Sequence, residues 1–371
     1  MRTSQKIENL EIYRGICALM VVIWHYFAHI NIPSFVVDQP HKRVVLQTIS
    51  NAFFELSTYA VLGFFVISGY VITRSVVRTT YKEDSFGLYF INRFIRLSSL
   101  CTAAVLFYMP LSYIYREIFD ITTVWPRFSD YSAGAIITSM VGLSSVWNGP
   151  GWTLLLEWVF YAFVAIPFLL LKPGFKNLLI LGACYMFLSQ YFYFSIESMI
   201  YVSFVFGIIG LLIHYKIKTI PTVLRFVILG CSVIAIGVQI YLLPNNYEHM
   251  ILRCLPLLGI LLFAFYSPSY TGRIYEKLLW LGRISFSLYI WHFPIFMYGT
   301  LFNNQADNAR SGWDLFYLTF ILVPIVFTVS HFSYLYIERN ARLERIPPLY
   351  RLYLRLAHKR GAKKPIEAAP W

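Results

Sequence analysis

Apolar stretches of about twenty residues recur along this chain from residue 10 to residue 337. An α-helix needs about 20 such residues to cross the hydrocarbon core of a bilayer. Charged residues make up only 13% of the chain, against about 25% in an ordinary soluble domain. A soluble globular fold is therefore excluded, and the sequence predicts an all-α, polytopic membrane protein.

The apolar runs, divided at their polar breaks, predict ten transmembrane helices. They lie near residues 10–30, 55–77, 94–115, 152–171, 177–195, 198–214, 223–243, 249–267, 281–301 and 315–337. The apolar segment 133–147 is too short to cross comfortably and stands before the turn Gly149-Pro150-Gly151. We expect this segment to be re-entrant or interfacial.

The distribution of basic residues predicts the orientation. With ten spans and a cytoplasmic N-terminus, most of the 31 Lys and Arg residues fall on the cytoplasmic side, as the positive-inside rule requires. Both termini are therefore predicted to be cytoplasmic, and the chain divides into a transmembrane domain, residues 1–338, and a basic cytoplasmic tail, residues 339–371. We expect the tail to bind anionic lipids.

The excess of basic residues on the cytoplasmic side accounts for the net charge of +13, so the charge does not indicate a nucleic-acid partner and none is expected. The five cysteines are scattered singly and none has the spacing of a metal site, so no metal cofactor is predicted either.

Ionisable side chains inside a span cost about 2.5 to 3.5 kcal/mol each, so each needs a reason. Arg14 and His25 are eleven residues apart in the first span, which puts them on one helix face about 16 Å apart along the axis. Glu157, in the fourth span, is expected about 8 Å below the outer edge, close to the depth of His25. We expect the two side chains to pair, which would orient the imidazole and raise its basicity. A purely structural ion pair is the alternative.

Two further groups of polar residues stand out. Ser285, Tyr289 and His292 form one polar stripe of the ninth span, where structural and functional roles are equally open for His292. At the inner interface, four arginines are expected to converge and to bind an anionic, phosphate-bearing ligand that arrives from the cytosol. These are Arg14, Arg74, Arg93 and Arg96. Positive-inside bias alone would explain any one of them. The small residues Ser68 and Gly69 are expected to allow close helix packing.

Taken together, the segments resemble the acyltransferase 3 family of multi-span membrane enzymes. The likeness rests on motifs that occur in the family's order: Arg14 with His25, the stretch from Phe64 through Ser68-Gly69 to Arg74, the pair Arg93 and Arg96, Trp152 with Glu157 and Tyr161, the run from Ser285 to His292 and Pro294, and Ile337-Glu338-Arg339. The sequence departs from the family at Leu97-Ser98-Ser99, where a tyrosine and a proline are usual, and at Thr153, where serine is usual.

The resemblance implies an enzyme that transfers an acyl group, by default acetyl, from cytoplasmic acyl-CoA to a hydroxyl of an extracytoplasmic or lipid-linked glycan. It also implies the bacterial inner membrane. In that reaction His25 would be the catalytic base, oriented by Glu157, and Arg14, Arg74, Arg93 and Arg96 would hold the donor's phosphates. Four further residues would shape the acceptor cavity or donate to the oxyanion: Trp152, Tyr161, Tyr289 and His292. A covalent acyl-histidine on His25 is the alternative to direct transfer. The competing hypothesis is a secondary or proton-coupled transporter in which His25, Glu157 and His292 form a relay.

Overall fold

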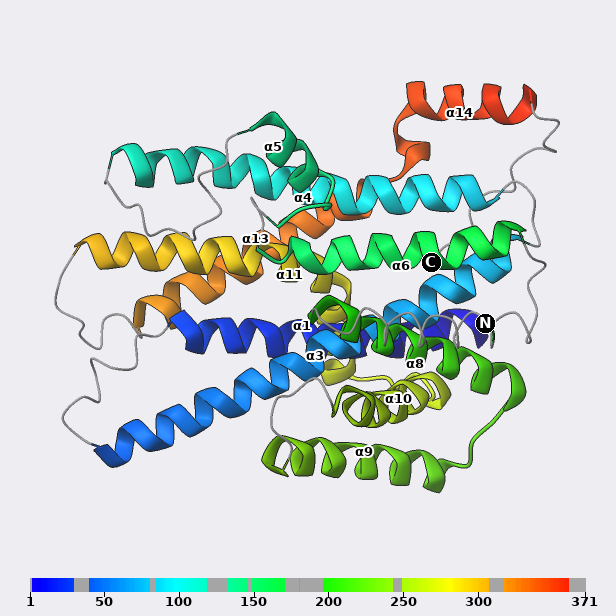
Figure 1. The fold of residues 1–371 in the computed structure, drawn as a ribbon, viewed down its shortest axis with the longest axis horizontal. Coiled ribbons are helices and arrows are strands. Elements are labelled where there is room, and N and C mark those ends of the chain that lie inside the picture. Colours follow the sequence, from blue (N-terminus) through cyan, green and yellow to red (C-terminus); the bar gives the residue numbers. More distant parts are fainter. Residues whose placement is uncertain are drawn as a thin grey trace.

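The computed structural model describes residues 2–29, 40–80, 85–118, 132–145, 149–170, 180, 196–242, 249–306 and 316–359. All regular structure in these ranges is helical and none is strand, which confirms the predicted all-α class. The helices are α1 (Arg2–His29), α3 (Pro40–Thr80), α4 (Ser85–Glu117), α5 (Ala133–Met140), α6 (Gly151–Leu170), α8 (Ile196–Lys216), α9 (Thr222–Leu242), α10 (Met250–Tyr266), α11 (Arg273–Ala306), α13 (Val323–Tyr336) and α14 (Pro347–Lys359) (Figure 1). A π-helical turn, η2 (Leu318–Leu322), precedes α13, and two 3-10 turns, η3 (Glu338–Asn340) and η4 (Leu343–Arg345), follow it.

Each predicted span coincides with a helix, except residues 177–195, of which the structure describes only Ile180. Within the described ranges, five helical segments are long and apolar enough to cross a membrane: Glu8–Ala28, Thr48–Val77, Leu88–Tyr115, Thr222–Leu242 and Leu318–Asn340. Two shorter apolar segments, Ile200–Lys216 and Ile251–Tyr266, accompany them. The chain is thus a helical membrane protein, whereas the count of ten spans and the orientation stay predictions.

Several helices are longer than the spans predicted for them. α3 has 41 residues and α11 has 34, whereas hydropathy delimits only the apolar part of each. A helix continues into polar flanks because its backbone hydrogen bonds are made within the helix itself. α5, by contrast, has eight residues, a length of about 12 Å that cannot cross a bilayer. This agrees with the expectation for segment 133–147.

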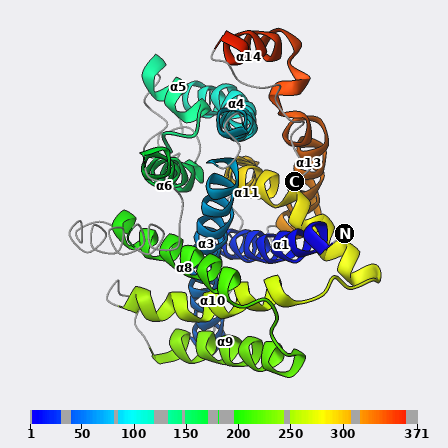
Figure 2. The same ribbon diagram turned by 90° about the vertical axis from the view of Figure 1, so that its right-hand side faces the viewer.

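α1 lies in the middle of the molecule between α11 and α3. In both views α4, α5 and α6 lie on one side of it and α9 and α10 on the other (Figures 1 and 2). Glycines allow the closest crossings: a Cβ atom on Gly15 of α1 would lie 2.6 Å from the backbone nitrogen of Gly282 in α11, and one on Gly69 of α3 would overlap the carbonyl group of Phe204 in α8. The packing role predicted for Gly69 is confirmed.

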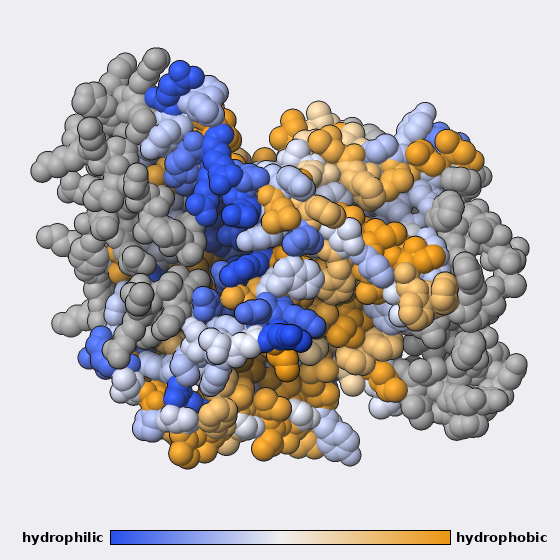
Figure 3. All heavy atoms as spheres, turned by 180° about the vertical axis from the view of Figure 1, so that it is seen from behind, coloured by the Kyte–Doolittle hydropathy of each residue, from blue (hydrophilic) through white to orange (hydrophobic). Residues whose placement is uncertain are grey.

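The outer surface fits a lipid environment. Seen from behind the view of Figure 1, hydrophobic atoms form broad areas of the described surface, and hydrophilic atoms gather toward the end where the chain begins (Figure 3). α9 in particular exposes large apolar side chains such as Val223, Ile234 and Tyr241.

Candidate active site

Two histidines meet in the interior between α1 and α11. The ring centroids of His25 and His292 are 4.8 Å apart, at an interplanar angle of 66°. The Nδ1 atom of His25 is 2.9 Å from the carbonyl oxygen of Val21, and that of His292 is 3.1 Å from the carbonyl oxygen of Leu288. A carbonyl oxygen can only accept, so each Nδ1 carries the proton and each Nε2 is the basic nitrogen.

Tyr289 belongs to the same layer. Its ring is 5.8 Å from that of His292 and 5.7 Å from that of Phe64 in α3. It hydrogen-bonds to the side chain of Thr153, whose hydroxyl in turn donates to the carbonyl oxygen of Pro150 at 2.9 Å. Thr153 therefore serves as a hydroxyl bridge between α11 and the start of α6. The structure brings Tyr289 and His292 together with His25.

The start of α6 lies in the interior beside this layer and not at an outer edge (Figure 1). A Cβ atom on Gly149, just before α6, would lie 2.7 Å from a ring carbon of Phe293, and the Phe293 ring is itself 5.7 Å from that of His25. Glu157 follows Gly151 by six residues, about 9 Å along the axis toward the other end of the molecule. The depth estimated for Glu157 from a span starting at the membrane surface was therefore wrong.

Glu157 accordingly has other partners than the one expected. Its carboxylate forms an ion pair with Arg93 of α4 and accepts a hydrogen bond of 3.3 Å from the Ser68 hydroxyl of α3. The other side of the Arg93 guanidinium is 3.5 Å from the Tyr89 hydroxyl. The structure thus brings Glu157 to the predicted donor arginines rather than to His25.

The two other predicted acceptor residues have ring contacts outside the histidine pair. Tyr161 comes one turn after Glu157 and stacks on Tyr89, with centroids 5.9 Å apart, so it sits beside Arg93 and not beside Tyr289. Trp152 is in the first turn of α6, 6.4 Å from the ring of Phe65. The shift of α6 toward the interior explains both positions.

A second carboxylate, which is buried, holds another of the arginines. The Nε and Nη2 atoms of Arg96 both bond to one oxygen of Glu338, the Nε atom at 3.1 Å. The other oxygen accepts a bond of 2.7 Å from the Ser287 hydroxyl of α11. Only 3% of Glu338 is exposed. Arg96 is therefore fixed between α4, α11 and the turn after α13.

Arg14 joins the same cluster. It interacts electrostatically with Arg93 and Arg96 and with the carboxylates of Glu338 and Glu11. The structure thus brings together three of the four arginines predicted to converge.

The fourth arginine lies elsewhere. The guanidinium of Arg74 lies 6.0 Å from the centroid of the Tyr70 ring. Tyr70 packs against His214 of α8 and Phe265 of α10. Arg74 therefore lies on the α8 and α10 side of α3, and the structure does not bring it together with Arg14.

Glu338 and Ser287 are the site residues that sequence reasoning missed. Both lie inside stretches that carry the family resemblance, but neither was given a role. An acidic residue at the end of an apolar span, on the side where arginines gather, was the available signal for Glu338. Ser287 lies off the stripe of Ser285, Tyr289 and His292, so periodicity did not select it.

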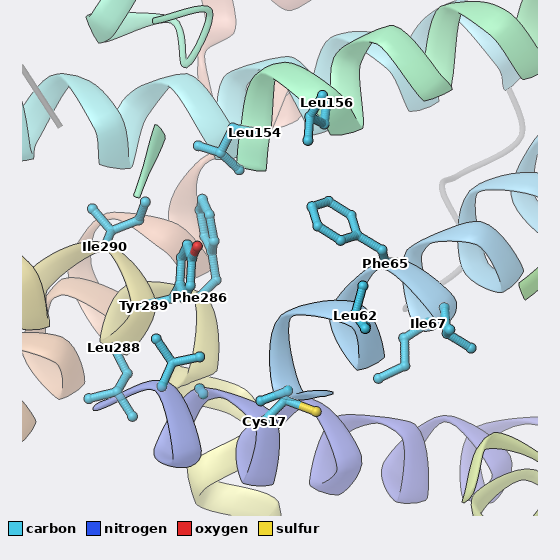
Figure 4. Packing of buried hydrophobic residues seen from close by; sticks show 14 of the residues in the cluster. Cys17, Leu62, Phe65, Ile67, Leu154, Leu156, Phe286, Leu288, Tyr289 and Ile290 are labelled. Atoms are coloured by element: carbon cyan, nitrogen blue, oxygen red, sulfur yellow. The ribbon is translucent and has the colours of Figure 1, made fainter. Parts of the chain in front are cut away.

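Buried apolar side chains lie around Tyr289 of the histidine layer. Figure 4 shows Leu62 and Phe65 of α3, Leu154 of α6, and Phe286 and Tyr289 of α11 turned toward a common interior. All five are buried. Within the described residues, no group of three or more His, Cys, Asp or Glu side chains is placed to hold a metal ion.

Comparison with known proteins identifies the family. A family model described as an acyltransferase domain matches residues 7–334. The chain belongs to the acyltransferase 3 family. The match covers both the histidine pair and the arginine cluster, so this acyltransferase 3 protein is a membrane acyltransferase, and the transporter hypothesis is not favoured. No curated protein and no solved structure matches the chain.

Proposed function

We propose that the protein transfers an acyl group, acetyl by default, from cytoplasmic acyl-CoA to a hydroxyl of an extracytoplasmic or lipid-linked glycan in the bacterial inner membrane. One observation carries the proposal. Helix α1 contributes His25 to the pair of imidazoles and Arg14 to the cluster of arginines, and these two residues are eleven positions apart. That spacing of about 16 Å is comparable to the length of an extended pantetheine arm.

The arginine cluster suits the donor's phosphates. Arg93 and Arg96 are each held by a carboxylate, Glu157 and Glu338 respectively. A guanidinium that is already oriented loses less conformational freedom when it binds a phosphate, and its planar fork matches two phosphate oxygens. Glu157 is thus a positioning residue for the donor site in this proposal, and Arg74 has no part in it.

The apolar interior around Tyr289 suits the arm of the donor. Leu62, Phe65 and Leu154 offer no hydrogen bonds to water. A thioester held among such side chains is protected from hydrolysis until the acceptor hydroxyl arrives.

The histidine layer supplies the chemistry. Nε2 of His25 removes the proton of the acceptor hydroxyl as its oxygen attacks the thioester carbonyl. The tetrahedral intermediate then collapses, the carbon–sulfur bond breaks, and the departing thiolate takes up the proton, so the products are an ester and the free thiol. His292, whose Nε2 becomes a donor when protonated, shares the proton with His25 and stabilises the oxyanion.

The test is the fate of the donor and the glycan. Membranes that contain the protein should release CoA thiol only when donor and acceptor are both present. Surface glycans should be heavier by one acyl group than those of cells lacking the chain, as measured by mass spectrometry. An unchanged glycan mass together with no thiol release would contradict the proposal. Substrate accumulation in sealed vesicles without donor consumption would instead favour a transporter.

A further inference from the structure

The chain after α13 does not leave the molecule at the end of the last span. It makes two 3-10 turns, η3 and η4, beside α4 before α14 begins (Figure 1). We call residues 338–345 the post-α13 edge. Ala341 and Leu343 of this edge are buried, so it is packed against the membrane domain.

Two residues of α4, one helical turn apart, hold this edge. The side-chain amide of Asn92 accepts a bond of 2.7 Å from the backbone nitrogen of Leu343 and donates one of 3.2 Å to Glu344. Arg96 binds Glu338 at the start of the edge. Because Asn92 and Arg96 share a face of α4, the edge lies along the face of α4 that carries the donor arginine Arg96.

Acidic and basic side chains of the edge face in different directions. Its two carboxylates, Glu338 and Glu344, are bonded to α4 and turned inward. Its three arginines, Arg339, Arg342 and Arg345, occupy every third position and are exposed. The edge therefore presents only positive charge to the solvent at the rim of the donor site.

The docked arginines of the edge are more than the membrane orientation of the chain requires. Positive-inside bias is satisfied by Lys or Arg on any short loop, without docking of the loop. The edge contains arginine and no lysine, whereas residues 351–364 contain both. Arginine is the side chain that matches phosphate oxygens with a planar fork of donors.

We propose that Arg339, Arg342 and Arg345 on the post-α13 edge bind the terminal phosphate of the acyl donor, so that the edge completes the donor site. The inference rests on the proposed function, because it assumes an acyl-CoA donor. The ribose 3′-phosphate of CoA is a dianionic monoester at the far end from the thioester, and it is the group that a rim beyond Arg96 would meet. A phosphate of an anionic lipid offers the same chemistry.

The test compares CoA with dephospho-CoA, which lacks the 3′-phosphate, as ligands of the purified full chain in uncharged detergent. The parent protein should bind CoA more tightly. The triple variant Arg339→Ala, Arg342→Ala, Arg345→Ala should bind CoA about tenfold or more weakly, since charge-assisted bonds are lost, while its affinity for dephospho-CoA stays the same. Asn92→Ala, which removes the two hydrogen bonds that dock the edge, should move the preference the same way.

Arg351→Ala is the matched control. Arg351 is exposed on α14, outside the edge, and its Nε donates to the carbonyl oxygen of Pro347 at 3.3 Å. This variant should keep the preference for CoA. The inference is wrong if the triple variant still prefers CoA, or if the variants weaken only the association with phosphatidylglycerol nanodiscs relative to phosphatidylcholine ones. A parent that binds neither CoA nor dephospho-CoA would contradict the proposed function itself.

Discussion

The two histidine rings are held by the same kind of hydrogen bond to the helix backbone. In each, Nδ1 donates to the carbonyl oxygen one helical turn earlier, so the backbone fixes both the ring orientation and the tautomer. No carboxylate is needed for that purpose, which removes the role that the sequence assigned to Glu157. Glu157 and Glu338 instead pair with Arg93 and Arg96, because guanidinium groups inside a membrane need counter-charges.

His25→Gln tests the catalytic role directly. The amide can keep a neutral hydrogen bond but cannot take a proton near pH 7. We expect transfer to fall by about 10² to 10⁴, measured as thiol release by purified protein, with donor binding unchanged. The matched control is His331→Gln on α13, where Nδ1 accepts from the Trp280 indole at 3.1 Å. Near-normal transfer by His25→Gln would make His25 a packed core residue.

Glu338→Gln tests the positioning of Arg96. The substitution keeps the shape of the side chain but removes the charge that orients the guanidinium, so donor affinity should fall by about 1.5 to 3 kcal/mol. We expect a higher KM for acyl-CoA with little change in kcat. Glu276→Gln, at the exposed start of α11, is the control. A fall in kcat alone would place Glu338 in the chemistry instead.

Helix crossings set the positions of these side chains at the next scale. Gly69→Ala would force α3 away from the Phe204 carbonyl of α8. We expect a loss of about 1 to 3 kcal/mol in stability, seen as a lower melting temperature in detergent. Gly230→Ala on α9 is the control, because a Cβ atom there meets nothing within 4 Å. Equal melting temperatures of the two variants would show that the crossing relaxes without cost.

A buried ion pair joins α10 to α3 away from the site. Arg253 is fully buried, bonds to Glu55 at 2.8 Å, and lies 5.3 Å from the centroid of the Tyr59 ring. Arg253→Met should cost about 3 to 5 kcal/mol, because it leaves a carboxylate unpaired in a partly buried position. The double variant with Glu55→Gln should recover much of the loss in the same thermal assay. An equal loss in both variants would point to the Tyr59 contact as the stabilising one.

For the molecule as a whole, the sequence was sufficient for the class and for most elements. A chain segment of about twenty apolar residues that crosses a bilayer satisfies its backbone hydrogen bonds by forming a helix. The apolar runs therefore located helices such as α1, α4 and α9 well. Hydropathy could not show that α6 starts in the interior, because the sequence of a turn such as Gly149-Pro150-Gly151 does not indicate how deep in the membrane the turn lies. For that reason the neighbours predicted for Glu157 and Tyr161 differ from those in the structure. The positions of Tyr289 and His292 relative to each other follow from the periodicity of one helix and did not depend on α6. Arg74 was misplaced because hydropathy gives a residue's depth but not the direction in which it faces.

The orientation of the molecule decides whether the donor can reach the arginine cluster. Both termini are predicted to be cytoplasmic, and Arg14 lies in the first half of α1, close to the N-terminal end. In a variant with its native cysteines replaced, thiols introduced at Ser4 and Ile366 should resist an impermeant reagent added to intact cells. A thiol at Asn308, in a predicted outer loop, should react. Permeabilised cells, in which all three should label, are the control. If Ser4 labels from outside, the arginines face away from the cytosol, acyl-CoA cannot supply them, and the proposed direction of transfer is wrong.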